Sequence, residues 1–520
     1  MKSLFSNWKD DVPASLVVYL VALPLCLGIA LASAGSEHLF SGIIAGVIGG
    51  IVVGFLSGAH VGVSGPAAGL ITIVTAAILT LGSYEAFLVA VILSGVFQMI
   101  GGYLKVGFIG HYFPSAVIKG MLAAIGITLI LGQIPHALGY DADFMGDESF
   151  VHPDHHNWFS ELLYAAKGIS PGAITTSVLS LIILIAFDRP FFKKNAFFKV
   201  LPGALFVVVL GIAINIISGM FFPAFKPTLD HLVQLPVAHS VSDVSTFFVF
   251  PDFSILKNPN VYGVALIIAL VGSVETLLSA EATDKLDPGK SRTPRNRELL
   301  AQGAGNILSG FLGGLPVTQV IVRSSANISA GGKTKLSAIL HGVLLIITAL
   351  CIPSILNLIP LASLAAILLM VGYKLSKLDL YKQMFKLGVE QYLPFIVTII
   401  CILFTDLLKG ITVGFTISVF FILRNNYRNN FTQTIVHEDN HDTIKIVLSE
   451  SVTFINKGSI LSRLNNLPNN SQVTIDGTFC KVIDYDVLEI IQDFEMHGSK
   501  VKNIELIIIN ITKVEVISAH

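Results

Sequence analysis

The stretch from Gly313 to Lys335 reads G-G-L-P-V-T-Q-V-I-V-R-S-S-A-N-I-S-A-G-G-K-T-K. Glycine pairs stand near both ends, Pro316 interrupts the stretch, and Arg323 is a lone charge within an apolar region. A helix needs about 20 apolar residues to cross a membrane, yet a helix here can start only after Pro316 and must break at Gly331. The stretch therefore predicts a half-helix whose N-terminus lies near the middle of a membrane.

A helix that starts inside a membrane has a chemical consequence. Non-helical backbone at that depth is tolerated only where it is buried in protein or lines a watery cavity. The free N–H groups at the helix start carry the positive end of the helix dipole and attract anions. The stretch therefore indicates anion transport.

The composition agrees with a membrane protein. Of the 520 residues 53% are hydrophobic and 13% are charged, whereas soluble domains carry roughly 25% charged residues. The net charge of -1 gives no sign of a nucleic-acid partner. Because no cleavable-signal pattern precedes the first apolar run, we expect that run to remain as a spanning helix. The four cysteines lie far apart, so neither a disulfide framework nor a cysteine metal site is expected.

Apolar runs divide the first part of the chain into fourteen predicted membrane segments. Two of these, 66–81 and 317–329, are short and interrupted, and each is the third segment of its set of seven. Basic loops at 189–199, 285–297 and 374–386 fall on one side, which places both termini in the cytoplasm by the positive-inside rule. The runs are 12–33, 40–57, 66–81, 84–102, 114–132, 169–187, 200–219, 261–280, 299–312, 317–329, 336–351, 354–373, 391–405 and 407–423.

The two interrupted segments predict the substrate site. In an inverted repeat of seven plus seven segments, equivalent broken helices face each other near the middle of the membrane. The first of them reads A-H-V-G-V-S-G-P-A-A-G-L from Ala59 to Leu70, a short strand followed by a proline suited to the first helical position. We expect a small anion to be held by backbone N–H groups of both helix starts. The predicted residues are Pro66, Ala67, Ala68, Val320, Ile321 and Val322.

The composition changes after Arg428. Residues 429–442 are polar and are interpreted as a linker between a membrane domain, 1–428, and a C-terminal domain, 443–520. From Thr443 onward short alternating runs flank an amphipathic stretch, Tyr485 to His497. This alternation predicts a small cytoplasmic α/β domain.

Several separate motifs resemble one family. S-V-E-T-L-L-S-A-E-A-T-D-K-L (273–286), N-R-E-L-L-A-Q-G-A-G-N-I (296–307), G-G-L-P-V-T, R-S-S-A-N and G-G-K-T are similar to the sulfate permease (SulP, solute carrier 26-type) anion transporters. The tail resembles their STAS domain in V-T-F-I-N-K-G-S-I-L (452–461), V-T-I-D (473–476) and I-D-Y-D-V-L (483–488). The resemblance implies fourteen segments in two inverted repeats, a core domain that moves against a gate domain, and a homodimer in the plasma membrane. It also implies an anion site between the third and tenth segments.

The resemblance also suggests roles for three side chains. Glu275 matches the acidic position of the family's eighth segment, and Ser279 lies one helical turn further on the same face. A buried carboxylate is costly when charged unless it is paired, so its protonation can be linked to anion occupancy. Glutamate at this position favours coupling to protons over sodium. Leu25 stands where many sulfate permeases have glutamine, which removes a donor and disfavours sulfate.

Some residues allow more than one interpretation. Arg323 either supplies positive potential to the anion, pairs with Glu275, or snorkels along the cavity. Gly65 either belongs to the anion site or is a packing glycine. The histidines of the loop at 133–168, His152, His155 and His156, suggest zinc but fit a solvated polar cluster better.

Together the residues and the resemblance favour a secondary transporter of inorganic anions. Bicarbonate is favoured slightly over sulfate, with coupling to a proton or sodium ion or by anion exchange. An uncoupled anion (chloride) channel and a nucleobase–cation symporter of the same architecture are the alternatives. No catalytic constellation supports an enzyme, and no cofactor or bound metal is expected. The C-terminal domain is expected to bind an unidentified cytoplasmic protein.

Overall fold

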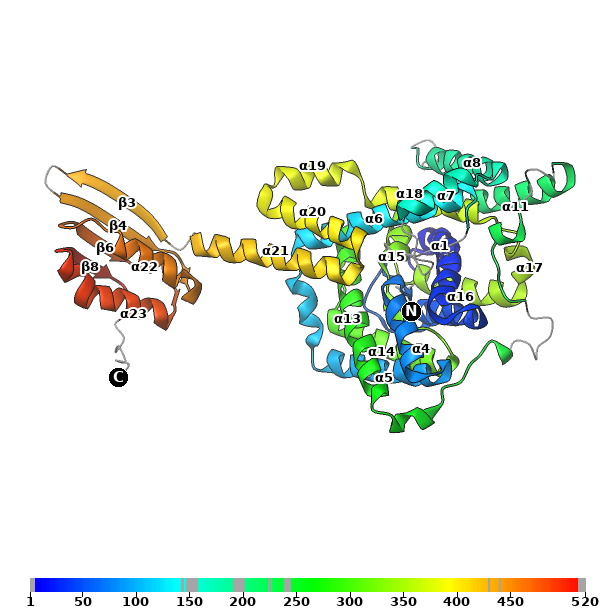
Figure 1. The fold of residues 1–520 in the computed structure, drawn as a ribbon, viewed down its shortest axis with the longest axis horizontal. Coiled ribbons are helices and arrows are strands. Elements are labelled where there is room, and N and C mark those ends of the chain that lie inside the picture. The colour runs from blue at the N-terminus through cyan, green and yellow to red at the C-terminus, as the bar shows by residue number, and fades with distance from the viewer. Residues whose placement is uncertain are drawn as a thin grey trace. The chain divides into compact units, whose positions relative to one another are not determined.

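Each of the fourteen apolar runs contains a helix in the computed structural model (Figure 1). The structure describes residues 5–141, 145, 158–189, 202–222, 225, 227–237, 245–428, 431–438 and 441–512. Within these residues seven helices are long and apolar enough to cross a membrane by themselves, and four further apolar helices are shorter. The chain is a multi-pass helical membrane protein.

The first set of seven segments contains one broken segment among longer helices. The second segment continues from α2 through a π-helical turn, Gly49–Val53, into α3, and the third segment is reduced to α4. A further helix, α7 (Trp158–Lys167), is bent by 111° from the helix that follows it. The helices are α1 (Trp8–Ala34), α2 (Phe40–Ile48), α3 (Gly54–Leu56), α4 (Ile71–Leu81), α5 (Tyr84–Tyr103), α6 (Ser115–Leu138), α8 (Pro171–Phe187) and α11 (Gly203–Phe221).

The second set repeats this plan. Its third segment, α15, is again the short one, with nine residues. The helices are α13 (Asn260–Leu286), α14 (Arg295–Leu312), α15 (Ile321–Ser329), α16 (Leu336–Cys351), α17 (Pro353–Leu356), α18 (Leu361–Leu375), α19 (Leu378–Lys386), α20 (Val389–Phe404) and α21 (Leu407–Arg428).

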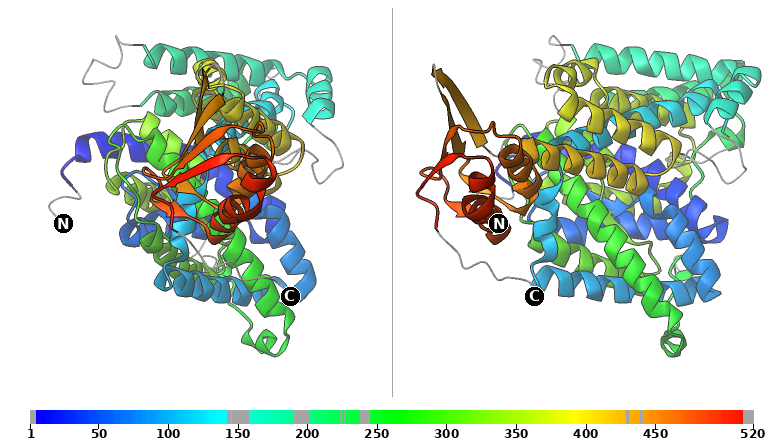
Figure 2. Two further views of the ribbon diagram at one scale, coloured as in Figure 1. Left: turned by 90° about the vertical axis from the view of Figure 1, so that its left-hand side faces the viewer. Right: turned by 60° about the vertical axis from the view of Figure 1, so that its left-hand side comes forward.

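These helices form two groups. The core group consists of α1, α2, α4, α5 and α13 to α16, and the gate group consists of α6, α8, α11, α18 and α20. In Figures 1 and 2 the blue and green helices of the core group occupy the lower part of this unit, and the teal and yellow helices of the gate group occupy the upper part. Glycines allow close helix contacts in both groups, because a Cβ on Gly95 of α5 would lie 2.5 Å from the Gly303 oxygen of α14. A Cβ on Gly126 of α6 would similarly lie 2.7 Å from the Gly372 oxygen of α18.

The chain divides into two compact units between Phe415 and Thr416. The second unit contains a four-stranded sheet in the order β3-β4-β6-β8. β3 (Phe431–Glu438) runs antiparallel to β4 (His441–Leu448), and β4, β6 (Gln472–Asp476) and β8 (Glu505–Ile509) are parallel. Two helices, α22 (Lys457–Asn465) and α23 (Tyr485–Asp493), complete this α/β unit together with the short paired strands β5 (Ser451–Val452) and β7 (Val482–Ile483).

The prediction that residues 429–442 form a linker is wrong. This range contains β3 and the start of β4, so the sheet begins at Phe431 rather than at Thr443. β3 is an edge strand with Thr and Gln among its residues, and a strand with one solvated edge can carry polar residues that resemble a linker in sequence.

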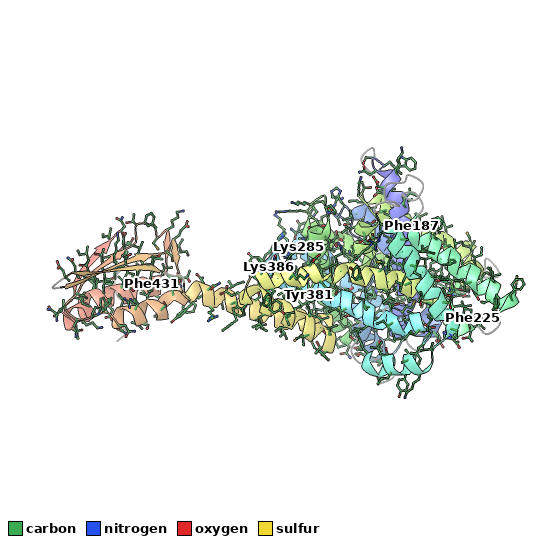
Figure 3. The ribbon with its side chains drawn as sticks, turned by 90° about the horizontal axis from the view of Figure 1, so that it is seen from above. Phe187, Phe225, Lys285, Tyr381, Lys386 and Phe431 are labelled. Carbon is green, nitrogen blue, oxygen red and sulfur yellow. The ribbon has the colours of Figure 1, made fainter. Side chains whose placement is uncertain are left out.

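Two of the basic segments lie toward the same end of the membrane unit. Lys285 is in the last turn of α13, and Lys386 is the last residue of α19. Figure 3 shows both side chains toward one end of this unit, whereas Phe225 lies toward the other end.

Candidate anion-binding site

Two strands of three residues bring the third and tenth segments together. β1 (Ser64–Pro66) pairs antiparallel with β2 (Val317–Gln319), and Gly65 lies opposite Thr318. β1 leads through a 3-10 turn, Ala68–Leu70, into α4, and β2 leads into α15. As predicted from the glycines and prolines, neither segment is a continuous helix.

The start of α15 has three backbone N–H groups without a helical acceptor. The first N–H that bonds within the helix is that of Ser324, which donates to the Val320 oxygen (3.2 Å). The N–H groups of residues 321–323 precede it and carry the positive end of the helix dipole. The prediction that the Val320 N–H also binds the anion is wrong, because this group donates to the Val63 oxygen (3.0 Å). Val320 still has extended backbone, with φ of -118°, and its N–H is used to join the chain segments.

The start of α4 differs from the prediction at Pro66. This proline ends β1 opposite Val317 instead of beginning the helix. Its fixed φ is compatible with an extended edge position, where its missing N–H costs no hydrogen bond. Helical bonding begins with the Leu70 N–H, which donates to the Ala67 oxygen (3.2 Å). The N–H groups at Ala68 and the following glycine therefore have no helical acceptor.

Both helix starts open on one cavity of about 40 Å³. A cavity needs at least about 10–15 Å³ to hold one water, so this one fits a small inorganic ion and is far smaller than a typical pocket for an organic ligand. All of the predicted site residues except Gly65 and Ala67 line it. The lining residues are Leu25, Ile29, Pro66, Ala68, Ile125, Glu275, Ser279, Val320, Ile321, Val322, Arg323 and Leu407.

Arg323 is the basic residue among those that line this cavity. Its side chain is 1% exposed, and its Nη2 donates to the Pro66 oxygen at 3.5 Å. Its Nε and Nη1 have no hydrogen-bond partner among the described residues, and no described carboxylate forms an ion pair with it. Arg323 thus places a positive charge at the wall of the cavity.

The carboxylate of Glu275, a residue of α13, lies beside the 3-10 turn that leads into α4. A Cβ built on Gly69 would be 3.3 Å from both carboxylate oxygens of Glu275. Negative charge is stabilised near a helix N-terminus, so this carboxylate lies where the dipole of α4 also attracts an anion. Ser279, one turn further along α13, lines the same cavity, and its carbonyl accepts a hydrogen bond from the Thr283 hydroxyl (2.6 Å).

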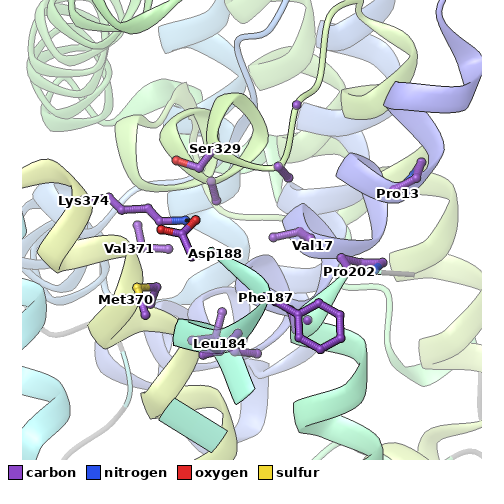
Figure 4. A pocket seen from close by; sticks show the side chains of 16 residues that line it. Pro13, Val17, Leu184, Phe187, Asp188, Pro202, Ser329, Met370, Val371 and Lys374 are labelled. Carbon is purple, nitrogen blue, oxygen red and sulfur yellow. Dashed lines mark ion pairs between the residues drawn. The ribbon is translucent and has the colours of Figure 1, made fainter. Parts of the chain in front are cut away.

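A second, larger cavity lies between the core and gate groups. It has a volume of about 310 Å³ and is bounded by α1, α8, α11, α15 and α18. Figure 4 shows Asp188 of the gate group paired with Lys374 at 3.5 Å, with Ser329 of α15 above them and Val17 of α1 to one side. Along α15 the small cavity is lined by residues 321–323 and the large cavity by residues at the opposite end of the helix.

Three lining residues were not predicted from the sequence. Ile29 comes from α1, Ile125 from α6 and Leu407 from α21. Each is an apolar residue within an apolar run, and nothing in the sequence distinguishes it from its lipid-facing or buried neighbours.

The predicted histidine cluster cannot be placed. His152, His155 and His156 lie outside the described residues. Within the residues that the structure does describe, no group of three or more His, Cys, Asp or Glu side chains is arranged to hold a metal ion.

The chain is similar to known membrane transporters. The family model described as the sulfate permease family matches residues 8–399. YvdB of Bacillus subtilis is 28% identical over 473 residues, which are 90% of this chain and 84% of YvdB. The bicarbonate transporter BicA of Picosynechococcus is 28% identical over 458 residues, which are 86% of this chain and 75% of BicA.

A solved structure shows that the similarity extends to the fold. The overall structure of SLC26A9 aligns with a TM-score of 0.66 and 16% identity, covering 97% of this chain and 84% of that chain. The shared fold therefore includes both the membrane unit and the C-terminal α/β unit.

Proposed function

This chain belongs to the sulfate permease family and is an anion transporter, and we propose that it moves bicarbonate or sulfate by secondary active transport. The observation that carries the proposal is the buried guanidinium of Arg323 beside two helix starts. A buried guanidinium is strongly unfavourable unless it is well hydrogen-bonded and neutralised, and Nε and Nη1 of Arg323 have no acceptor among the described residues, which favours a negative ligand in the cavity. The N–H groups of Ile321 and Val322 supply further donors to the same ligand.

The charges around the cavity favour a monovalent anion. Arg323 supplies one positive charge, and Glu275 supplies one negative charge when it is ionised. A monoanion together with protonated Glu275 leaves the site neutral, whereas sulfate adds a second negative charge without a matching side chain. The apolar side chain of Leu25 offers no additional donor to a dianion. Bicarbonate, which the relative BicA is named for, is therefore our preferred substrate.

Glu275 is proposed to couple the anion to a cation. Its carboxylate and the anion are both attracted to the start of α4, so they repel each other when both are charged. A proton on Glu275 removes this repulsion, and a sodium ion held with Ser279 would offset it. Binding of the anion and of the cation then favour each other, as symport requires.

Other features support proposals for the orientation of the chain in the membrane, the route of the anion and the role of the C-terminal unit. The positions of Lys285 and Lys386 toward one end support cytoplasmic basic loops and termini in a plasma membrane. The 310 Å³ cavity between the core and gate groups is proposed as the route by which the anion reaches the site. The C-terminal unit is proposed to be a STAS domain that binds an unidentified cytoplasmic protein, and the chain is proposed to form a homodimer.

Uptake into proteoliposomes tests this proposal. We expect labelled bicarbonate to accumulate against its gradient when a proton or sodium gradient is imposed, and we expect sulfate to accumulate less. Arg323→Met should abolish uptake, whereas Arg297→Met, a change at an exposed arginine whose Nε donates to the Leu56 oxygen, should retain it. Anion flux that follows the anion gradient alone, independent of pH and sodium, would identify a channel and contradict the proposal.

A further inference from the structure

One face of α14 is polar although it is fully buried. Glu298, Gln302, Asn306 and Ser309 are each at most 1% exposed. Their spacing of four, four and three residues places them on the same side of the helix. Burial of polar groups is unfavourable unless they find hydrogen-bond partners, and every polar side-chain atom of this face except Oε1 of Gln302 has one among the described residues.

The second half of this face holds β2. The side-chain nitrogen of Asn306 donates to the Val317 oxygen (3.1 Å), and the Val317 N–H donates back to the Asn306 side-chain oxygen (2.5 Å). The same nitrogen also donates to Oε1 of Gln98 (2.7 Å). Ser309 donates from its hydroxyl to the Leu315 oxygen (2.6 Å), two residues before β2. The first residue of β2 is thus fixed at both of its backbone groups.

The first half of the face holds β1. Nε2 of Gln302 donates to the Ser64 hydroxyl (2.8 Å) and to Oε1 of Glu298 (2.9 Å). The other carboxylate oxygen of Glu298 accepts a hydrogen bond from the Ser57 hydroxyl. Both oxygens of Glu298 act as acceptors in these bonds, so the nitrogen of the Gln302 amide, and not its oxygen, faces this side. Glu298 therefore determines that Gln302 presents a donor to Ser64.

None of these four side chains lines the 40 Å³ cavity. Gln302 contacts β1 at Ser64 and Asn306 contacts β2 at Val317, whereas the nearby residues Pro66, at the end of β1, and Val320, after β2, do line it. A shift of either strand changes the spacing of the two helix starts and of the guanidinium that bonds to the Pro66 oxygen. Backbone donors lose effect when their distance to an anion increases by a few tenths of an ångström beyond hydrogen-bond range.

We propose that Gln302 and Asn306, with Glu298 as the residue that orients Gln302, are positioning residues for anion binding. This inference rests on the proposed anion site. These residues act through the strands: Gln302 through Ser64 on β1, and Asn306 through Val317 on β2. Loss of either contact weakens anion binding while the helices of the core group stay folded.

The test compares Gln302→Met, Ser64→Ala and the double variant in the full-length chain. Gln302→Met keeps the length of the side chain but removes the donor to both Ser64 and Glu298, whereas Ser64→Ala removes only the hydroxyl that accepts from Gln302. Because both break the Gln302–Ser64 hydrogen bond, which contributes about 1 kcal/mol, we expect each to raise the KM for bicarbonate uptake about fivefold, with Vmax close to wild type. Tm should stay close to wild type in Ser64→Ala and should fall in Gln302→Met, which also removes a hydrogen-bond partner of Glu298. The double variant should be no worse than the stronger single variant, since residues that act through one contact are not additive. Gln133→Met is the matched control, because Gln133 is an equally buried glutamine on α6 of the gate group.

The outcomes separate this inference from the proposed function. If the wild type takes up bicarbonate and both Ser64→Ala and Gln302→Met keep the wild-type KM, the positioning role alone is overturned. Additive effects of the two changes, or a loss of Vmax and Tm with KM unaffected, would also overturn it, because they indicate independent or purely structural roles. If Gln302→Met does not fold, the KM of Ser64→Ala decides the question. Absence of bicarbonate and sulfate uptake by the wild type would instead contradict the proposed function.

Discussion

A methyl group at Gly65 should weaken anion binding by displacing Arg323. A Cβ built on Gly65 would lie 2.0 Å from Nη1 of Arg323. An ordinary contact begins at 3.4 Å, so the guanidinium must retreat by about 1.4 Å. Gly65 does not have a positive φ, and alanine is therefore compatible with its backbone. The consequence of Gly65→Ala is confined to the arginine that packs against it.

The displacement of the guanidinium gives an estimate of how much anion binding is weakened. Two unit charges about 4 Å apart attract by about 4 kcal/mol at an effective dielectric constant of about 20. An additional 1.4 Å reduces this attraction by about 1 kcal/mol, which corresponds to about a sixfold weaker interaction. We therefore expect Gly65→Ala to raise the KM for anion uptake about sixfold.

The assay is labelled bicarbonate uptake into proteoliposomes over a range of concentrations. Gly101→Ala is the control, because a Cβ on Gly101 of α5 meets nothing within 4 Å. When Arg323→Met is already present, adding Gly65→Ala should not weaken anion binding any further, because the charge that Gly65→Ala displaces is already gone. This comparison uses a direct measurement of anion binding. A folded Gly65→Ala variant with the KM of the Gly101→Ala control would refute the reasoning that Arg323 acts as the charge partner from this position.

Further predictions concern coupling, the cavity and the pair formed by His231 and Asp141. Glu275→Gln should abolish cation-driven accumulation while anion binding remains measurable, and unchanged gradient-driven uptake would remove Glu275 from the mechanism. Tryptophan at Ile321 or at Ala67 should block uptake by filling the 40 Å³ cavity or the helix start beside it, and normal uptake by both variants would place the site elsewhere. The hydrogen bond to Asp141 raises the pKa of His231, so His231 stabilises the fold most below about pH 6.5 and this contribution is lost as the pH rises through the raised pKa. The difference in Tm between wild type and His231→Gln should accordingly shrink as the pH rises from 6 to 9, and a constant difference would contradict a titrating interaction.

The broken segments could be predicted because backbone chemistry alone determines them. Gly331 and Pro316 bound a stretch too short to cross a membrane, and the same argument applies near Pro66. The exact donors could not be predicted in this way. The Val320 N–H donates to the oxygen of Val63, a residue 257 positions away in the sequence. Pro66 ends a strand because Val317 lies opposite it. Such pairings depend on the tertiary fold and have no local signal.

The groups that surround Arg323 could not be predicted from the sequence either. An arginine in an apolar run is compatible with pairing, snorkelling or anion binding, and only the positions of the surrounding carboxylates distinguish these alternatives. The strand β3 was missed for a different reason. Its solvated edge allows polar residues, so its composition resembles that of a linker. The polar face of α14, in contrast, has a regular spacing at 298, 302, 306 and 309 that is visible in the sequence but gives no indication of what it contacts.

The pairing of β1 with β2 restricts how the protein can work. One strand comes from each half of the chain, and their hydrogen bonds join the two half-helices edge to edge. Separating the helix tips to release an anion would break this ladder inside the membrane, where the freed backbone groups find no water. We therefore expect β1, β2 and the two helix starts to move together, and access to either side of the membrane to come from their movement past the gate group.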